Sequence, residues 1–171
     1  YPPKGETPYD FKNQKYYREF KRCKKCGHFF NFHNLNLEDL YKKDYLNTTY
    51  KNVQGMKKTF NNIISIPFNK SDNKNRVSRL ISLLKKEFKK DLNKIKILDV
   101  GSGLGVFPYE LRKKNFSVNA IEQDSRAVEY LQKYAGIKSY QYDFLKKKKN
   151  NLPKYNLNTL NKILKHFENQ T

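Results

Sequence analysis

The apolar residues between positions 73 and 92 recur every three or four residues, which is the spacing of one face of an α-helix. These residues are Val77, Leu80, Ile81, Leu84 and Phe88. Lys and Arg fill much of the remaining surface, and Asp72 or Asn73 is the expected N-cap. The pattern therefore predicts one amphipathic helix over residues 73–92.

From Lys94 onward the apolar pattern changes to short runs that alternate with helical spacings. The runs predict four strands, at residues 95–100, 117–122, 138–142 and 156–160. One helix is expected after the first run, to about Lys114, and another begins at the start of the 162–167 segment. The helix between the second and third strands is expected to have Asp124 or Ser125 as its cap and Gly136 as its stop. Its expected apolar face consists of Ala127, Val128, Leu131 and Tyr134. This alternation predicts an α/β fold, namely a partial Rossmann-like sheet of about four parallel strands with flanking helices.

Residues 1–70 lack this regularity, so we expect a small, loop-rich N-terminal module there and a second domain over residues 71–171. Residues 52–55 are interpreted as a break, and residues 57–66 as a short helix or an extended segment that Pro67 ends. The most distinctive feature is a knuckle-like stretch, residues 23–28, whose two cysteines form a C-x-x-C pair.

The first predicted strand of the second domain runs directly into three alternating glycines at positions 101, 103 and 105. Glycine permits a positive φ and removes the side chain where a ligand must lie against the backbone. The helix that follows offers free N–H groups to an anionic group. An acid, Glu122, follows about 20 residues later at the end of the next strand, where a carboxylate can accept hydrogen bonds from ribose hydroxyls. A structural glycine turn without a ligand is the alternative interpretation.

The spacing G-x-G-x-G, with Asp99 two residues before the first glycine, resembles motif I of class I S-adenosylmethionine-dependent methyltransferases. Residues 120–124 and 142–144 resemble motifs II and III, and residues 155–167 resemble the fourth strand and its helix. Here Asn156 and Lys165 stand where family members usually have Asp and Glu. The resemblance implies S-adenosylmethionine as the cofactor. It implies nine binding residues: Asp99, Gly101, Ser102, Gly103, Gly105, Glu122, Gln123, Asp143 and Phe144.

The N-terminal motifs, at residues 22–28, 40–45 and 49–50, are similar to the zinc-binding domain of sugar C-methyltransferases and related polysaccharide-associated methyltransferases. That resemblance implies Cys23 and Cys26 as metal ligands, although a tetrahedral zinc site takes four ligands. Three arrangements stay open: a second cysteine pair upstream of residue 1, a degenerate site without metal, and a set completed by His28 and His33.

In this family a histidine after the fourth strand lies near the substrate, which makes His166 the candidate catalytic residue for proton transfer. A histidine on a helix surface or in a core, without chemistry, is the alternative. The expected reaction is methyl transfer to a small-molecule, sugar-like acceptor in surface polysaccharide biosynthesis. Because the fourth strand is expected to be an exposed apolar edge, a second chain that completes the fold is an expected partner.

The net charge of +20 raises a second possibility, an RNA or nucleic-acid methyltransferase. However, the lysines spread along the whole chain together with abundant Asn, as a compositional bias would also produce. A truncated, non-catalytic cofactor-binding remnant is a third hypothesis. No apolar run approaches the length of a membrane span, and two cysteines give no disulfide framework, so a cytoplasmic protein without membrane contact is expected.

Overall fold

The computed structural model describes residues 15, 17–33, 50, 52–88, 92–143, 152–161 and 163. The chain divides into two compact units, residues 1–51 and residues 52–171. In this division residues 52–70 belong to the second unit, where the ring of Phe60 packs against the ring of Tyr109, whereas the sequence suggested a boundary at residue 71. Within the described residues, no helix combines the length and the apolar composition that crossing a membrane requires.

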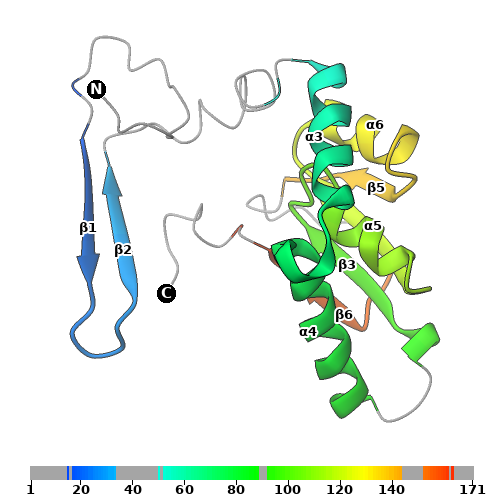
Figure 1. Cartoon of the computed structure of the whole chain (residues 1–171), viewed down its shortest axis with the longest axis horizontal. Coiled ribbons are helices and arrows are strands. Elements are labelled where there is room, and N and C mark those ends of the chain that lie inside the picture. The colour runs from blue at the N-terminus through cyan, green and yellow to red at the C-terminus, as the bar shows by residue number, and fades with distance from the viewer. Residues whose placement is uncertain are drawn as a thin grey trace. The chain divides into compact units, whose positions relative to one another are not determined.

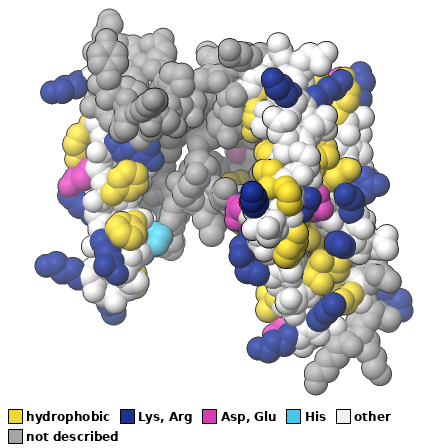
Figure 2. All heavy atoms as spheres, in the orientation of Figure 1, with side chains coloured by type: hydrophobic (Ala, Val, Ile, Leu, Met, Phe, Trp, Pro, Cys, Tyr) yellow, Lys and Arg dark blue, Asp and Glu magenta, His cyan; other side chains and the backbone are white. Residues whose placement is uncertain are grey.

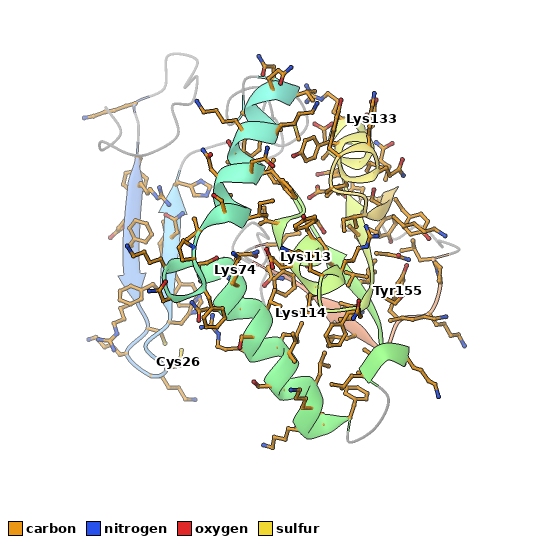
Figure 3. The ribbon with its side chains drawn as sticks, turned by 45° about the vertical axis from the view of Figure 1, so that its right-hand side comes forward. Cys26, Lys74, Lys113, Lys114, Lys133 and Tyr155 are labelled. Atoms are coloured by element: carbon orange, nitrogen blue, oxygen red, sulfur yellow. The ribbon has the colours of Figure 1, made fainter. Side chains whose placement is uncertain are left out.

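The first unit contains a two-stranded antiparallel hairpin, with β1 at Arg18–Arg22 and β2 at Phe29–His33. The turn between the strands holds both cysteines, and Figure 3 shows Cys26 at its tip. Two backbone hydrogen bonds close the turn, one from Cys23 N–H to His28 O (2.7 Å) and one from Gly27 N–H to Cys23 O (2.9 Å). The knuckle expected from the sequence is thus the end of a hairpin whose strands the sequence pattern did not predict.

The second unit is built around a parallel sheet of four strands in the order β5-β4-β3-β6. The strands are β3 (Lys96–Val100), β4 (Ser117–Glu122), β5 (Lys138–Gln141) and β6 (Leu157–Thr159). The expected α/β class is confirmed. The first strand of the sheet, β3, has its successor β4 on one side and the last described strand, β6, on the other. This reversal creates a switch point between β3 and β6, and ligands of such sheets bind beyond the carboxyl ends of the strands at that point.

The described part of this unit contains four helices (Figure 1), together with the short 3-10 turns η2 (Phe68–Lys70) and η3 (Leu92–Lys94). The helices are α3 (Val53–Ser65), α4 (Asp72–Glu87), α5 (Val106–Arg112) and α6 (Ser125–Lys133). Side chains of α4 and α5, among them Leu84 and Leu111, pack on the sheet face that carries Ile97 and Val118. Phe60 of α3 contacts the rings of Tyr109 in α5 and Tyr130 in α6, which joins the remaining helices to α5.

The opposite face of the sheet carries Leu98, Val100 and Ile121. Residues of the segments next to β6 pack over these side chains, including Tyr155 and Ile163. The Asn119 amide donates to the Tyr155 hydroxyl (2.8 Å), which ties this segment to the central strand β4. Both faces of β3 are therefore covered, as the continuous apolar run of a buried parallel strand requires.

Several helix ends differ from the sequence-based expectation. Ser71, not Asp72 or Asn73, caps α4, because its hydroxyl accepts the Lys74 N–H (3.2 Å) while the Asn73 amide donates to Val106 O. The break expected at residues 52–55 is a helix start, since the side chain of Asn52 caps α3 by accepting the N–H three residues on. Asp124 caps α6 as predicted. Tyr130 of this helix is buried, whereas Tyr134, which was expected on its apolar face, is exposed.

Candidate cofactor-binding site

The site is built around the loop that leaves β3, where Gly101, Gly103 and Gly105 all have positive φ. A Cβ at Gly105 would lie 2.4 Å from Leu131 Cδ2, so this glycine lets α6 pack against the loop. Gly103 differs, because a Cβ there would meet no atom within 4 Å. The loop is therefore closed by protein at Gly105 and open beside Gly103, where a ligand can approach the backbone.

Asp99 anchors the start of this loop from inside the sheet, with 1% of its surface exposed. Its Oδ2 accepts the Ser102 hydroxyl (2.7 Å) across the turn. Its Oδ1 accepts the Thr159 hydroxyl (2.6 Å) and the Asn161 amide (3.2 Å) from the end of β6. One carboxylate thus fixes the glycine loop and joins β3 to β6 at the switch point.

Burial raises the pKa of Asp99, although the hydrogen bonds from Ser102, Thr159 and Asn161 oppose that rise. A carboxyl that makes these bonds is a structural anchor of the site. Both of its oxygens already accept protein donors, and through these hydrogen bonds Asp99 holds the loop in place.

Glu122 ends β4 beside the loop, and its carboxylate turns back toward the glycines. Its Oε1 accepts the Gly103 N–H, and its Oε2 accepts the N–H of Gln123 (3.3 Å). Desolvation raises the pKa of Glu122 to about 7, and the bonds from Gly103 and Gln123 only partly offset this effect. The acid predicted from sequence spacing is therefore brought into direct contact with the open part of the glycine loop.

The structure brings most of the predicted cofactor-binding residues to this carboxyl edge of the sheet. Gln123 directly follows β4, and its carbonyl accepts the side-chain amide of Gln141 (3.1 Å) at the end of β5. Asp143 lies two residues beyond β5 and is half-buried. Phe144 and the candidate catalytic residue His166 lie outside the described residues.

Sequence reasoning missed two residues of the site, Thr159 and Asn161. Their contribution depends on the pairing of β6 with β3, which sets Thr159 opposite Asp99. Asn156, which departs from the family pattern, lies at the other end of β6. Its side chain accepts the Lys96 N–H (2.8 Å) and extends the strand pairing there, so the departure does not touch the site.

The two cysteines lie in the other unit, and both are free thiols. Backbone N–H groups of Cys26 and Lys25, together with the Cys26 thiol, lower the pKa of the Cys23 thiol. Such a turn favours a thiolate, the form that binds metals. Zinc would need more ligands, and among the residues that the structure describes no group of three or more candidate metal ligands occurs.

The fold and the site thus define a parallel α/β domain with a glycine loop after β3, the Asp99 carboxyl at its switch point and the Glu122 carboxyl at the end of the neighbouring strand β4. No protein-family model and no curated protein sequence matches the chain. One similar solved structure is coclaurine N-methyltransferase bound to N-methylheliamine and SAH, at 16% sequence identity and a TM-score of 0.30. The likeness covers 63% of this chain and 40% of that chain, so this chain spans less than half of that protein. The functional interpretation therefore depends on the residues of the site itself.

Proposed function

We propose that this chain binds S-adenosylmethionine at the glycine loop and takes part in methyl transfer. The observation that carries the proposal is the contact between Glu122 and Gly103 N–H beside the open side of the loop. A carboxylate at the end of the second strand, next to a glycine loop after the first, is the arrangement that binds the ribose of a nucleoside cofactor. The order of the sequence motifs, from Asp99 to Asp143, supports the same cofactor.

The residues present fit such a ligand in two respects. The space beside Gly103 is one that a Cβ would begin to fill, and apart from the two neighbouring residues of the chain no atom of the described residues lies within 4 Å of that position. Glu122 has two carboxylate oxygens that can accept hydroxyl groups, and its present partners are backbone N–H groups at the rim of the same space. In the proposed complex, Glu122 holds the ribose, while Gln123 and Asp143 lie at the strand ends next to the base.

When bound, the cofactor supplies a methyl group on a positively charged sulfur, which is electrophilic without help from the protein. The protein has to hold the cofactor and the acceptor in position for the transfer. Asp99 keeps the glycine loop in place through Ser102 and holds β6 at the same edge through Thr159. Fixing the reactants in this way is worth more to a displacement reaction than any single contact.

The proposed acceptor is a sugar or sugar nucleotide of surface polysaccharide biosynthesis. Its support is the resemblance of the N-terminal motifs, including Cys23 and Cys26, to sugar C-methyltransferases. A zinc ion at these cysteines belongs to the same proposal, and it requires ligands beyond the two thiols.

Calorimetric titration with S-adenosylmethionine and S-adenosylhomocysteine tests the cofactor assignment. We expect micromolar binding by the wild-type chain and its loss in Glu122→Ala, because the ribose hydroxyls then have no acceptor. Glu129→Ala is the matched control, since it removes an exposed glutamate of α6 with the same change in net charge. Absence of binding by a folded wild-type sample, or equal binding by Glu122→Ala, would overturn the proposal.

A further inference from the structure

The hairpin of the first unit exposes aromatic rings in a way that a folded core does not explain. Phe20 is 60% exposed and Phe29 is 63% exposed, and both faces of the ribbon remain open within the described residues. A two-stranded hairpin gains stability by covering its apolar face. Rings that remain this exposed on a small surface indicate a binding surface.

Strand register divides the ribbon into two different faces. Phe20 pairs with Asn31, and Arg22 pairs with Phe29, so these residues share one face with the outer pair of Arg18 and His33. We call this surface the arginine face. Its residues are Arg18, Phe20, Arg22, Phe29, Asn31 and His33. It carries two guanidinium groups and no carboxylate.

Each ring of the arginine face has a guanidinium group beside it. Arg18 Cζ lies 4.8 Å from the ring centre of Phe20, and its Nε donates to Asn31 Oδ1 (3.0 Å). Arg22 Cζ lies 5.8 Å from the ring centre of Phe29. The hydrogen bond and the two cation–π contacts hold cations and rings together while the rings stay exposed. Figure 2 shows the alternation of hydrophobic and basic side chains along this ribbon.

The opposite face has a different character. Phe30 and Phe32 lie there, but so does Glu19, which accepts the Tyr17 hydroxyl (2.7 Å) and pairs with Lys21 (3.3 Å). That carboxylate neutralises the lysine and repels an anionic ligand. The two faces have two phenylalanines each and a similar exposure, and they differ in charge.

We propose that the arginine face binds single-stranded nucleic acid, with bases stacked on Phe20 and Phe29 and phosphates held by Arg18 and Arg22. Stacking on exposed aromatic rings together with contacts from arginine is how proteins bind single strands without reading a sequence. Phe20 and Phe29 stand diagonally across the strand pair, so two successive bases can each meet a ring. A duplex hides the faces of its bases and cannot use these rings. This function belongs to the first unit and does not depend on the cofactor site.

Fluorescence anisotropy of the full chain with a labelled, mixed-sequence RNA of about 12 nucleotides provides the test. Phe20→Ala with Phe29→Ala removes both rings and leaves the net charge unchanged. We expect its affinity to fall at least about tenfold, because each stacked base contributes about fivefold to a hundredfold. Phe30→Ala with Phe32→Ala is the matched control and should bind within about twofold of wild type. Phe20→Tyr with Phe29→Tyr keeps both rings and should retain wild-type binding.

Charge is tested separately. Arg18→Gln with Arg22→Gln should reduce the slope of log affinity against log salt concentration by about 1.4, since each phosphate contact in a single strand contributes about 0.7. A strand that contains 5-iodouridine, irradiated with the wild-type chain, should cross-link at Phe20 or Phe29. This measurement does not depend on any variant being folded.

Four results would overturn the proposal. Equal binding by wild type and both alanine pairs would mean that dispersed lysines alone attract the RNA. Equal loss in both pairs, or cross-links that avoid the arginine face, would mean that the face has no specific role. Binding of phosphatidylserine vesicles, but of no RNA, in a Phe20- and Phe29-dependent manner would assign the face to a membrane surface instead.

Discussion

The carboxyl of Glu122 gives a direct prediction about stability, because its environment penalises the charged form. Glu122→Gln replaces the carboxyl with a neutral group of the same shape. The Gln oxygen can still accept the Gly103 N–H, whereas the amide nitrogen gives up the longer contact with the Gln123 N–H (3.3 Å). The variant therefore removes the charge and that one contact, and the pH dependence of the difference in stability between the two proteins isolates the cost of the charge.

The pKa of Glu122 rises from an ordinary value of 4.5 to about 7 in the folded chain. Between these two pH values the folded state holds a proton that the unfolded state has released. Wild-type stability therefore falls as the pH rises from about 4.5 to about 7 and does not fall further from this cause. A difference of about 2.5 pKa units corresponds to about 3 kcal/mol of unfolding free energy.

Urea unfolding, followed by the helical circular dichroism signal at pH 5 and pH 8, measures this effect. At pH 8 we expect Glu122→Gln to be more stable than wild type by about 3 kcal/mol. At pH 5 the two should differ by much less. Glu129→Gln removes an exposed carboxyl of α6 and should follow wild type at both pH values.

The reasoning is refuted if wild type and Glu122→Gln lose the same stability between pH 5 and pH 8. That result would mean that the carboxylate is hydrated in the folded chain and that the contact with Gly103 does not desolvate it. A variant less stable than wild type at pH 8 would also refute it, because ionised Glu122 would then stabilise the fold.

Two further substitutions test the glycine loop and its anchor. Gly105→Ala should destabilise the chain more than Gly103→Ala in urea unfolding. Both substitutions place an alanine at a positive φ, which costs about 1–2 kcal/mol of stability. Of the two, only the substitution at Gly105 also forces the Leu131 side chain to move, which costs about 1–3 kcal/mol more. Gly103→Ala should instead weaken S-adenosylhomocysteine binding in calorimetry, and equal stability losses would contradict this division of roles. Thr159→Val removes a donor to the buried Asp99 carboxyl and should cost about 1–3 kcal/mol of unfolding free energy in urea. A variant as stable as wild type would show that this hydrogen bond does not hold the carboxyl.

The sheet could be predicted from the sequence because its signals are local. The strand over residues 117–122 matches β4 residue for residue, since an apolar run sits between a turn and a capping Asp124. The loop after β3 was equally visible, because three glycines in five residues follow a buried strand. Local signals were ambiguous where one residue indicates whether a helix begins or the chain breaks. Gly55 suggested a break, although Asn52 caps a helix that tolerates this glycine.

The remaining features depend on pairings that the sequence does not display. Thr159 and Asn161 contact Asp99 across about 60 residues of chain, and only the position of β6 beside β3 brings them there. The hairpin was missed for a different reason. Its strands bury no face, so β1 and β2 lack the alternation of inward apolar and outward polar residues by which a half-buried strand is recognised.

The two carboxyls beside the glycine loop differ in how the fold compensates their burial. Burial raises the pKa of Asp99, and desolvation raises that of Glu122. Asp99 is compensated by three donors from protein side chains, whereas Glu122 has only backbone N–H groups. A ligand that donates hydroxyl groups to Glu122 would stabilise its charged form and lower its pKa again. The incomplete satisfaction of this one carboxyl is therefore the feature on which the proposed binding site depends.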